Sequence, residues 1–153
     1  MARAQLTGPN EVGRVIARPF LGEPGSFKRT ANRHDYAIPP PQGMLMDQLL
    51  EAGVFTYGVG KIHDIYCGRG FTDYIKMDGN ADGVAKTIAA MKTHKSGFIF
   101  TNLVDFDMLY GHRNDVEGYA TALDQFDTAL PRSDDMIGPR DLLLMTAGPG
   151  CGE

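Results

Sequence analysis

Residues 97–104 read Gly-Phe-Ile-Phe-Thr-Asn-Leu-Val, and this stretch decides the fold class of the chain. Side chains alternate between the two faces of an extended strand, and here apolar residues occur on both faces. Two apolar faces are typical of a strand in a parallel sheet that helices cover from both sides. The stretch therefore predicts a central parallel strand in an α/β domain.

Helical and extended patterns alternate on either side of this strand. Helices are predicted over 44–52, 81–93 and 116–130, and further strands over 54–59 and 141–146. Asn80 and Asp115 are candidate N-caps, and Pro131 is the expected end of the last helix. The apolar stripe of that helix comprises Val116, Tyr119, Ala120, Leu123, Phe126 and Leu130. This order predicts a parallel sheet with right-handed crossovers and helices on both faces.

A run of three prolines, Pro39–Pro41, is the strongest boundary signal in the chain. Such a run cannot lie inside a helix or a central strand, and it favours a stiff extended conformation. The sequence therefore predicts two domains, a small one over 1–41 and a larger one over 42–153.

The composition excludes several classes of protein. With 19 acidic and 15 basic residues among 153, the formal charge is −4, so the chain lacks the basic face that a nucleic-acid partner requires. It contains no run of about 18 apolar residues for a membrane span and no secretory signal, so we expect a cytoplasmic protein that binds no membrane. Cys67 and Cys151 match no zinc spacing and are expected to be free thiols.

The segment from Asp105 to His112 is the first candidate for chemistry. It follows the most apolar strand directly, and ligands of parallel α/β sheets bind at the carboxyl ends of strands. Its two carboxylates and one imidazole suit Mn²⁺, Mg²⁺ or Zn²⁺. The alternative is that Asp105 or Asp107 caps a turn and His112 is a solvated loop residue.

Basic residues form the second candidate. Lys28, Arg29, Arg33 and His34 could bind a phosphate, or could be a solvated loop that pairs with local acids such as Asp35. Lys61 follows the predicted strand 54–59, where it could hold a phosphate or could simply be an exposed loop residue.

Four motifs, taken together and in this order, resemble the phosphopentomutases of the alkaline phosphatase superfamily. They are Gly-Arg-Val-Ile-Ala-Arg-Pro-Phe at 13–20, Phe-Lys-Arg-Thr-Ala-Asn-Arg-His-Asp-Tyr at 27–36, Gly-Lys-Ile-His-Asp-Ile at 60–65 and Asn-Leu-Val-Asp-Phe-Asp-Met-Leu-Tyr-Gly-His-Arg at 102–113. The resemblance spans about residues 12–146 and corresponds to the C-terminal part of a family member. It implies that 42–153 is part of an alkaline-phosphatase-like core and that 1–41 is a remnant of the cap domain.

The resemblance also implies a function and a site. The family interconverts ribose or deoxyribose 1-phosphate and the 5-phosphate in nucleoside catabolism, through two Mn²⁺ ions and a phosphothreonine. Asp107 and His112 correspond to two ligands of one manganese ion. The residues that correspond to substrate contacts, with the basic ones facing the phosphate of the pentose phosphate, are Arg14, Ile16, Arg29 and Lys61.

The chain also departs from the family pattern. The family places a metal-binding Asp-His pair after its last motif strand, whereas Thr146 is followed here by Ala-Gly-Pro-Gly-Cys. The part of the family that carries the first metal-binding Asp and the nucleophilic Thr has no counterpart in this sequence. We therefore expect a truncated, inactive phosphopentomutase, or alternatively a non-catalytic sugar-phosphate binding or interaction module. An incomplete sheet is further expected to self-associate through its exposed edge.

Overall fold

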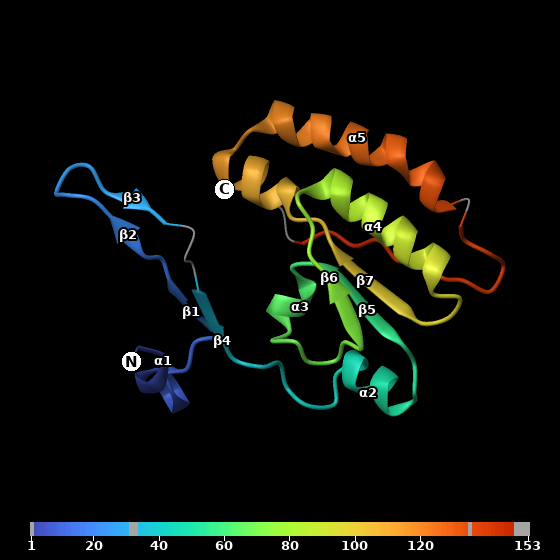
Figure 1. Cartoon of the computed structure of the whole chain (residues 1–153), viewed down its shortest axis with the longest axis horizontal. Coiled ribbons are helices and arrows are strands. Elements are labelled where there is room, and N and C mark those ends of the chain that lie inside the picture. The colour runs from blue at the N-terminus through green and yellow to red at the C-terminus, as the bar shows by residue number, and fades with distance from the viewer. Residues whose placement is uncertain (1, 31–33, 135, 149–153) are drawn as a thin grey trace. The chain divides into compact units, whose positions relative to one another are not determined.

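A computed structural model describes residues 2–30, 34–134 and 136–148. The chain divides into two compact units, Met1–Pro41 and Gln42–Glu153, and the boundary lies directly after the proline run. Elements of the first unit are α1 (Ala2–Gln5), the 3-10 turn η1 (Gly8–Asn10), β1 (Arg14–Ala17), β2 (Phe20–Leu21), β3 (Lys28–Arg29) and β4 (His34–Ala37) (Figure 1).

The first unit consists mainly of two antiparallel ribbons. Strand β1 pairs with β4, so that Ile16 lies opposite Asp35, and β2 pairs with β3. The rings of Phe20 and Phe27 meet edge to face, with their centroids 4.9 Å apart. None of the described side chains in this unit is buried. Two-stranded ribbons without a packed face are marginally stable in water, so this unit contributes little stability of its own.

The second unit carries a parallel sheet. Its elements are α2 (Leu45–Glu51), β5 (Thr56–Gly60), α3 (Ile62–Ile65), β6 (Asp73–Ile75), α4 (Asn80–Thr93), β7 (Phe98–Asn102), the π-helical turn η2 (Phe106–Tyr110), the 3-10 turn η3 (Gly111–Arg113) and α5 (Val116–Asp134). The strands of this sheet run in the order β6-β5-β7, and both neighbours of β5 are parallel to it. The predicted α/β fold with a parallel sheet is confirmed.

Helices cover this sheet on both sides. Figure 1 shows α4 along one side, with α5 beyond it, and α2 and α3 on the other side. Helix α4 contacts β5 and β7, and α5 contacts α4. The core is made of small and medium apolar side chains, namely Met46, Val59, Ile62, Ile88, Ala90 and Ala122. No helix in the described part of the chain is long and apolar enough to cross a membrane.

Most predicted elements form where the sequence patterns place them. The helices predicted over 44–52, 81–93 and 116–130 correspond to α2, α4 and α5, and the strands over 54–59 and 97–104 correspond to β5 and β7. The N-cap role of Asp115 is also confirmed, because its Oδ1 accepts a hydrogen bond of 2.9 Å from the Gly118 N–H.

The predicted central strand is wrong in one respect. In the described sheet the middle strand is β5, whereas β7 lies at one side of it. Four of the five residues of β5 are buried, and all five residues of β7 are only half-buried. Apolar residues on both faces of a strand indicate that helices cover both faces of the sheet. They do not indicate how many strands pair with that strand on either side.

The strand predicted over 141–146 does not form. Residues 141–148 have no regular secondary structure, and the exposed fractions of Leu142 and Leu144 are 80% and 72%. A strand needs a neighbour to accept and donate its backbone hydrogen bonds, and none of the described strands pairs with this segment. Strand β6, in contrast, was not predicted, because three residues give too short a pattern.

Three details of the predicted helices are also wrong. Helix α5 continues past Pro131 to Asp134, since a proline in the final turn removes only one hydrogen bond. Helix α4 begins at Asn80 after Gly79, and the Asn80 side chain bonds elsewhere. The predicted stripe of α5 is partly solvent-exposed, with Val116 78% and Leu123 47% exposed, whereas Ala122 is buried.

Candidate functional site

The candidate site lies where β5 and β7 end. These neighbouring strands are parallel, and their last residues, Gly60 and Asn102, are register partners. Lys61 follows the first strand directly, and the segment 105–112 begins three residues after the second. The topology therefore brings both sequence candidates of the second unit to one edge of the sheet, which is the edge where α/β proteins bind ligands.

Two turns shape the segment after β7. Residues Phe106–Tyr110 form the wide turn η2 and Gly111–Arg113 the tight turn η3. The Phe106 ring packs on α5, with its centroid 5.5 Å from that of Tyr119 and 6.2 Å from that of Phe126. This apolar anchor fixes the start of the segment, while the next residue, Asp107, remains 57% exposed at its side chain.

The two turns bring Asp107 and His112 together. The Oδ2 atom of Asp107 lies 3.2 Å from Nε2 of His112, and the His112 side chain is 71% exposed. Two ligands bound to one metal ion at about 2.1 Å, with an angle of about 90–110° between them, are about 3.0–3.4 Å apart. The pair therefore fits two adjacent positions around a metal ion, and it fits equally a surface ion pair between a carboxylate and an imidazolium.

A third donor does not join this pair in the described part of the chain. No group of three His, Cys, Asp or Glu side chains with metal-binding geometry occurs among these residues. Asp105, the other carboxylate of the segment, accepts a hydrogen bond of 2.6 Å from the backbone N–H of Asn80. Asp105 therefore caps the start of helix α4, whereas the alternative left open by the sequence was the cap of a turn.

Lys61 lies at the junction of β5 and α3. It is half-buried and precedes the first residue of the helix, while Gly60 before it has a φ of +85°. A Cβ at Gly60 would lie 2.8 Å from Sδ of Met77 and 3.0 Å from the Asn102 carbonyl oxygen, so this position has no room for a side chain. The glycine allows the chain to turn sharply at the end of β5, directly before Lys61.

The remaining predicted site residues belong to the first unit. Arg14 and Ile16 are two residues apart on β1, so their side chains point to the same face of the ribbon. An ion pair of 3.4 Å joins Arg14 to Asp35 on the adjacent β4. Arg29 lies on β3, opposite Phe20. Of the basic cluster, Arg33 lies outside the described residues, and His34 packs edge to face on Tyr36.

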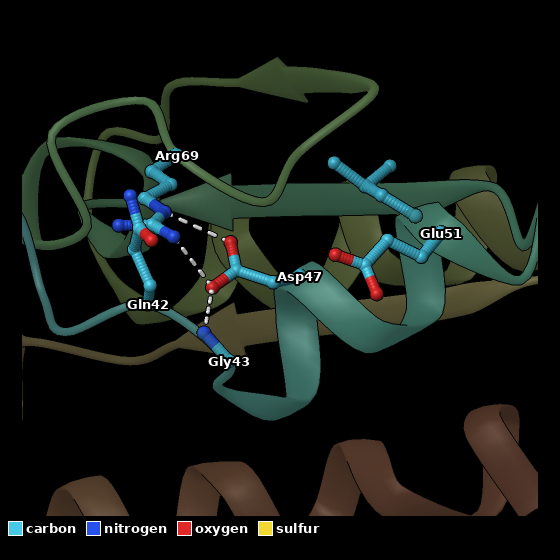
Figure 2. A pocket seen from close by; sticks show the side chains of 6 residues that line it. Gln42, Gly43, Asp47, Glu51 and Arg69 are labelled. Carbon is cyan, nitrogen blue, oxygen red and sulfur yellow. Dashed lines mark hydrogen bonds and ion pairs between the residues drawn. The ribbon is translucent and has the colours of Figure 1, made fainter.

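Sequence reasoning missed an ion pair that joins α2 to the loop before β6. Arg69 donates hydrogen bonds of 2.8 Å from Nε and Nη2 to the two carboxylate oxygens of Asp47. Asp47 Oδ2 also accepts from the backbone N–H groups of Gly43 and Met44, at 2.9 and 3.3 Å. Both residues line a surface hollow of about 660 Å³. Figure 2 shows the Asp47 and Arg69 side chains facing each other there. The only indication of this ion pair in the sequence was the position of Asp47, which lies in the first turn of a predicted helix.

The Asp47 carboxylate is stabilised in its charged form. The hydrogen bond from Arg69 is the largest cause that lowers the pKa of Asp47 below its ordinary value of 3.8, and it outweighs the opposing effect of burial. A folded-state pKa below the unfolded value stabilises the fold above that unfolded value, and this stabilisation is lost as the pH falls through the folded value.

The Asp47→Asn variant is therefore expected to lose stability in a pH-dependent way. The difference in unfolding free energy from the parent should be largest at about pH 6 and should shrink below about pH 4. Urea denaturation across this range measures it. Glu51→Gln is the matched control, because Glu51 lines the same hollow and makes no side-chain hydrogen bond in the described part of the chain. A difference for Asp47→Asn that persists unchanged at pH 3 contradicts the prediction.

Comparison with known proteins identifies relatives. Residues 9–153 match the family model of the Metalloenzyme superfamily. The chain is 57% identical over 151 residues to a phosphopentomutase of Desulfitobacterium hafniense (strain DSM 10664 / DCB-2), and 53% identical over 151 residues to one of Carboxydothermus hydrogenoformans. Each alignment covers 99% of this chain and 39% of the relative, so the chain spans about two fifths of the length of these relatives. The resemblance to phosphopentomutases is thereby confirmed.

Proposed function

The chain belongs to the Metalloenzyme superfamily, and from this premise we propose that it carries part of the manganese and pentose-phosphate site of a phosphopentomutase. Membership of the superfamily implies dependence on a metal ion. One observation carries the proposal for this site, namely that Asp107 Oδ2 and His112 Nε2 lie 3.2 Å apart at the carboxyl end of β7, and membership of the superfamily favours a metal pair over a surface ion pair. The high identity to phosphopentomutases supports ribose or deoxyribose phosphate as the ligand.

Each proposed residue has a distinct task. Asp107 and His112 would hold the metal ion, and a carboxylate with an imidazole suits Mn²⁺. The bound metal would supply a Lewis acid that neutralises charge on phosphoryl oxygens. Lys61 would attract the phosphate as a point charge. Arg14 and Arg29 would each donate two hydrogen bonds to phosphate oxygens. Ile16 would contact the sugar beside Arg14, since the two share one face of β1.

The donor set supports binding without turnover. Among the residues that the structure describes, Asp107 and His112 supply two donors, and phosphoryl transfer by a two-metal mechanism requires several ligands for each ion. We therefore propose that this chain alone binds a sugar phosphate and does not interconvert its 1- and 5-phosphates.

One experiment tests both parts of this proposal. The purified chain is incubated with Mn²⁺ and ribose 1-phosphate, and conversion, bound metal and melting temperature are measured. We expect a metal-dependent rise in melting temperature that increases with ribose 1-phosphate, and no conversion. Turnover with about two bound metal ions overturns the proposed inactivity. The absence of any thermal shift with Mn²⁺ and with the sugar phosphate overturns the proposed site.

The Lys61→Met variant is expected to bind ribose phosphate about tenfold more weakly, because one charge-assisted hydrogen bond is lost while the apolar stem is kept. Titration calorimetry in the presence of Mn²⁺ measures this affinity. Lys95→Met is the matched control, since Lys95 is an exposed lysine that precedes β7 and so lies at the opposite edge of the sheet. Equal affinities for the two variants would show that Lys61 does not contact the phosphate.

The sequence predicted self-association through an exposed sheet edge, and we propose instead that copies of this chain associate through the apolar run 142–145, which is solvent-exposed. Exposed fractions along the run 142–145 are 80%, 42%, 72% and 60%. Such a contiguous surface favours contact with a second copy. The Leu142→Lys/Leu144→Lys variant should elute from size-exclusion chromatography at a smaller mass than the parent, and Leu45→Lys, on exposed Leu45 of α2, should not. A parent chain that is monomeric at high concentration refutes the association.

A further inference from the structure

Two residues 25 positions apart, Asn80 and Asp105, bond reciprocally beside the candidate site. The Asn80 N–H donates to Asp105 Oδ2 at 2.6 Å, and the Asp105 N–H donates to Asn80 Oδ1 at 3.0 Å. Both residues are half-buried. The first residue of α4 is thus fixed to the residue from which the donor segment after β7 begins.

The surroundings restrict this pair further. Gly79 has a φ of +89°, and a Cβ at this position would lie 2.8 Å from Asp105 Oδ2. Asn80 Nδ2 is buried and has no hydrogen-bond partner among the described residues, so the bonds made by the rest of the pair must offset that cost. The backbone at the start of α4 and the Asp105 carboxylate therefore lie so close together that a side chain at position 79 would displace one of them.

The geometry points to a positioning role, and we propose that Asn80 and Asp105 fix the place of the Asp107 and His112 donors. This inference rests on the proposed function. Asp107 follows Asp105 by two residues, and the Met108 N–H bonds to the Val104 carbonyl oxygen across Asp105 at 2.9 Å. A change in the direction of the chain at Asp105 therefore moves Asp107 with it.

Asp105 acts in this way through its bond to α4, and not as a metal ligand. Its carboxylate lies at the N-terminus of a helix of 14 residues, where the helix dipole and a backbone N–H stabilise the negative charge. The opposite reading, in which Asp105 itself binds the metal, predicts a different outcome for one conservative variant. An amide at this position can still accept the Asn80 N–H, but it is a much poorer metal ligand than a carboxylate.

The test follows the His112 imidazole by NMR while the full chain is titrated with Mn²⁺, which broadens the signals of nearby protons. The midpoint concentration for broadening of the His112 ring signal is expected to rise about tenfold in Asp105→Ala and in Asn80→Ala, because loss of a group that orients a ligand costs about 10–100-fold in affinity. Asp105→Asn should stay within about twofold of the parent, since it keeps the hydrogen bond to Asn80.

Thr87→Val provides the matched structural control. Thr87 Oγ1 lies 2.6 Å from Thr101 Oγ1 and forms another side-chain link between α4 and β7, at a position away from the donor segment. This variant should lower the melting temperature without changing the Mn²⁺ midpoint. Dispersed amide spectra identify the variants that remain folded, and Asn80→Ala and Asp105→Ala test the same link from its two ends.

The outcomes separate this inference from the proposed function. If the parent shows no selective broadening at His112, both are overturned. If the parent and both alanine variants share one midpoint, the metal pair stands and the positioning role is refuted. A large loss in Asp105→Asn would make Asp105 a metal ligand and also overturn the inference, whereas loss in the alanine variants with rescue by Asp105→Asn supports it.

Discussion

Substitution of Asp107 by alanine is expected to abolish the rise in melting temperature that the proposed Mn²⁺ site should give the parent chain. A ligand at ten times its dissociation constant stabilises the folded state by about 1.4 kcal/mol, or about 3–6 °C for a chain of this size. With Asp107 removed, His112 is the only remaining member of the pair. A single imidazole binds Mn²⁺ too weakly to be detected at the same concentration.

The control for this prediction is Asp124→Ala, which removes an exposed carboxylate from α5. It alters the net charge equally, so a general attraction of Mn²⁺ to an acidic protein would affect both variants alike. Differential scanning fluorimetry with and without Mn²⁺ gives the four melting temperatures. A full thermal shift in Asp107→Ala would place the metal site at other residues.

The second large effect is expected for Gly70→Ala, which should destabilise the fold by about 3–4 kcal/mol. Gly70 has a φ of +85°, which costs a residue with a Cβ about 1–2 kcal/mol. The added Cβ would lie 2.3 Å from Cβ of Met46, a core residue that is only 3% exposed. Neither atom can move by side-chain rotation, so the loop before β6 must shift away from α2, and overpacking of this kind costs about 1–3 kcal/mol.

Gly53→Ala is the matched control, because it has the same backbone requirement without the collision. Gly53 ends α2 with a φ of +72°, and a Cβ there would meet nothing within 4 Å. Its substitution should therefore cost only the conformational part, about 1–2 kcal/mol. Urea denaturation of both variants measures the difference. If the two variants lose equal stability, the close approach of Gly70 to Met46 does not restrict the fold.

The parts of the fold that could be predicted are those with a long, repeated pattern. Val84, Ile88 and Met91 recur at helical spacing within α4, and the apolar run of β7 needs helices above and below it. Position within the sheet could not be predicted, because it depends on which strands pair. The exposed segment 141–148 shows the same limit, since its apolar residues are compatible with a strand but its partner is not encoded locally.

The sequence predicted where the candidate site would lie in the fold, but it did not predict the geometry of the candidate residues. The apolar strand before Asp105 indicated a strand end, which is where ligands bind in such sheets. Asp107 and His112 are five residues apart, a spacing that a regular α-helix does not place on one face. The wide turn η2 brings the two side chains within 3.2 Å, and no pattern in the sequence predicted that turn. The bond between Asn80 and Asp105 was equally hidden, because 25 residues separate its partners.

The two ribbons of residues 1–41 have a consequence for affinity measurements. Because the described side chains of this unit are not buried, its local unfolding requires little free energy. A ligand that contacts Arg14 would therefore bind only the fraction of chains in which this unit is ordered. The apparent dissociation constant equals the intrinsic constant divided by the competent fraction. If this chain binds a sugar phosphate as proposed, conditions that favour compact chains, such as osmolytes, should therefore strengthen that binding without changing any contact to the ligand.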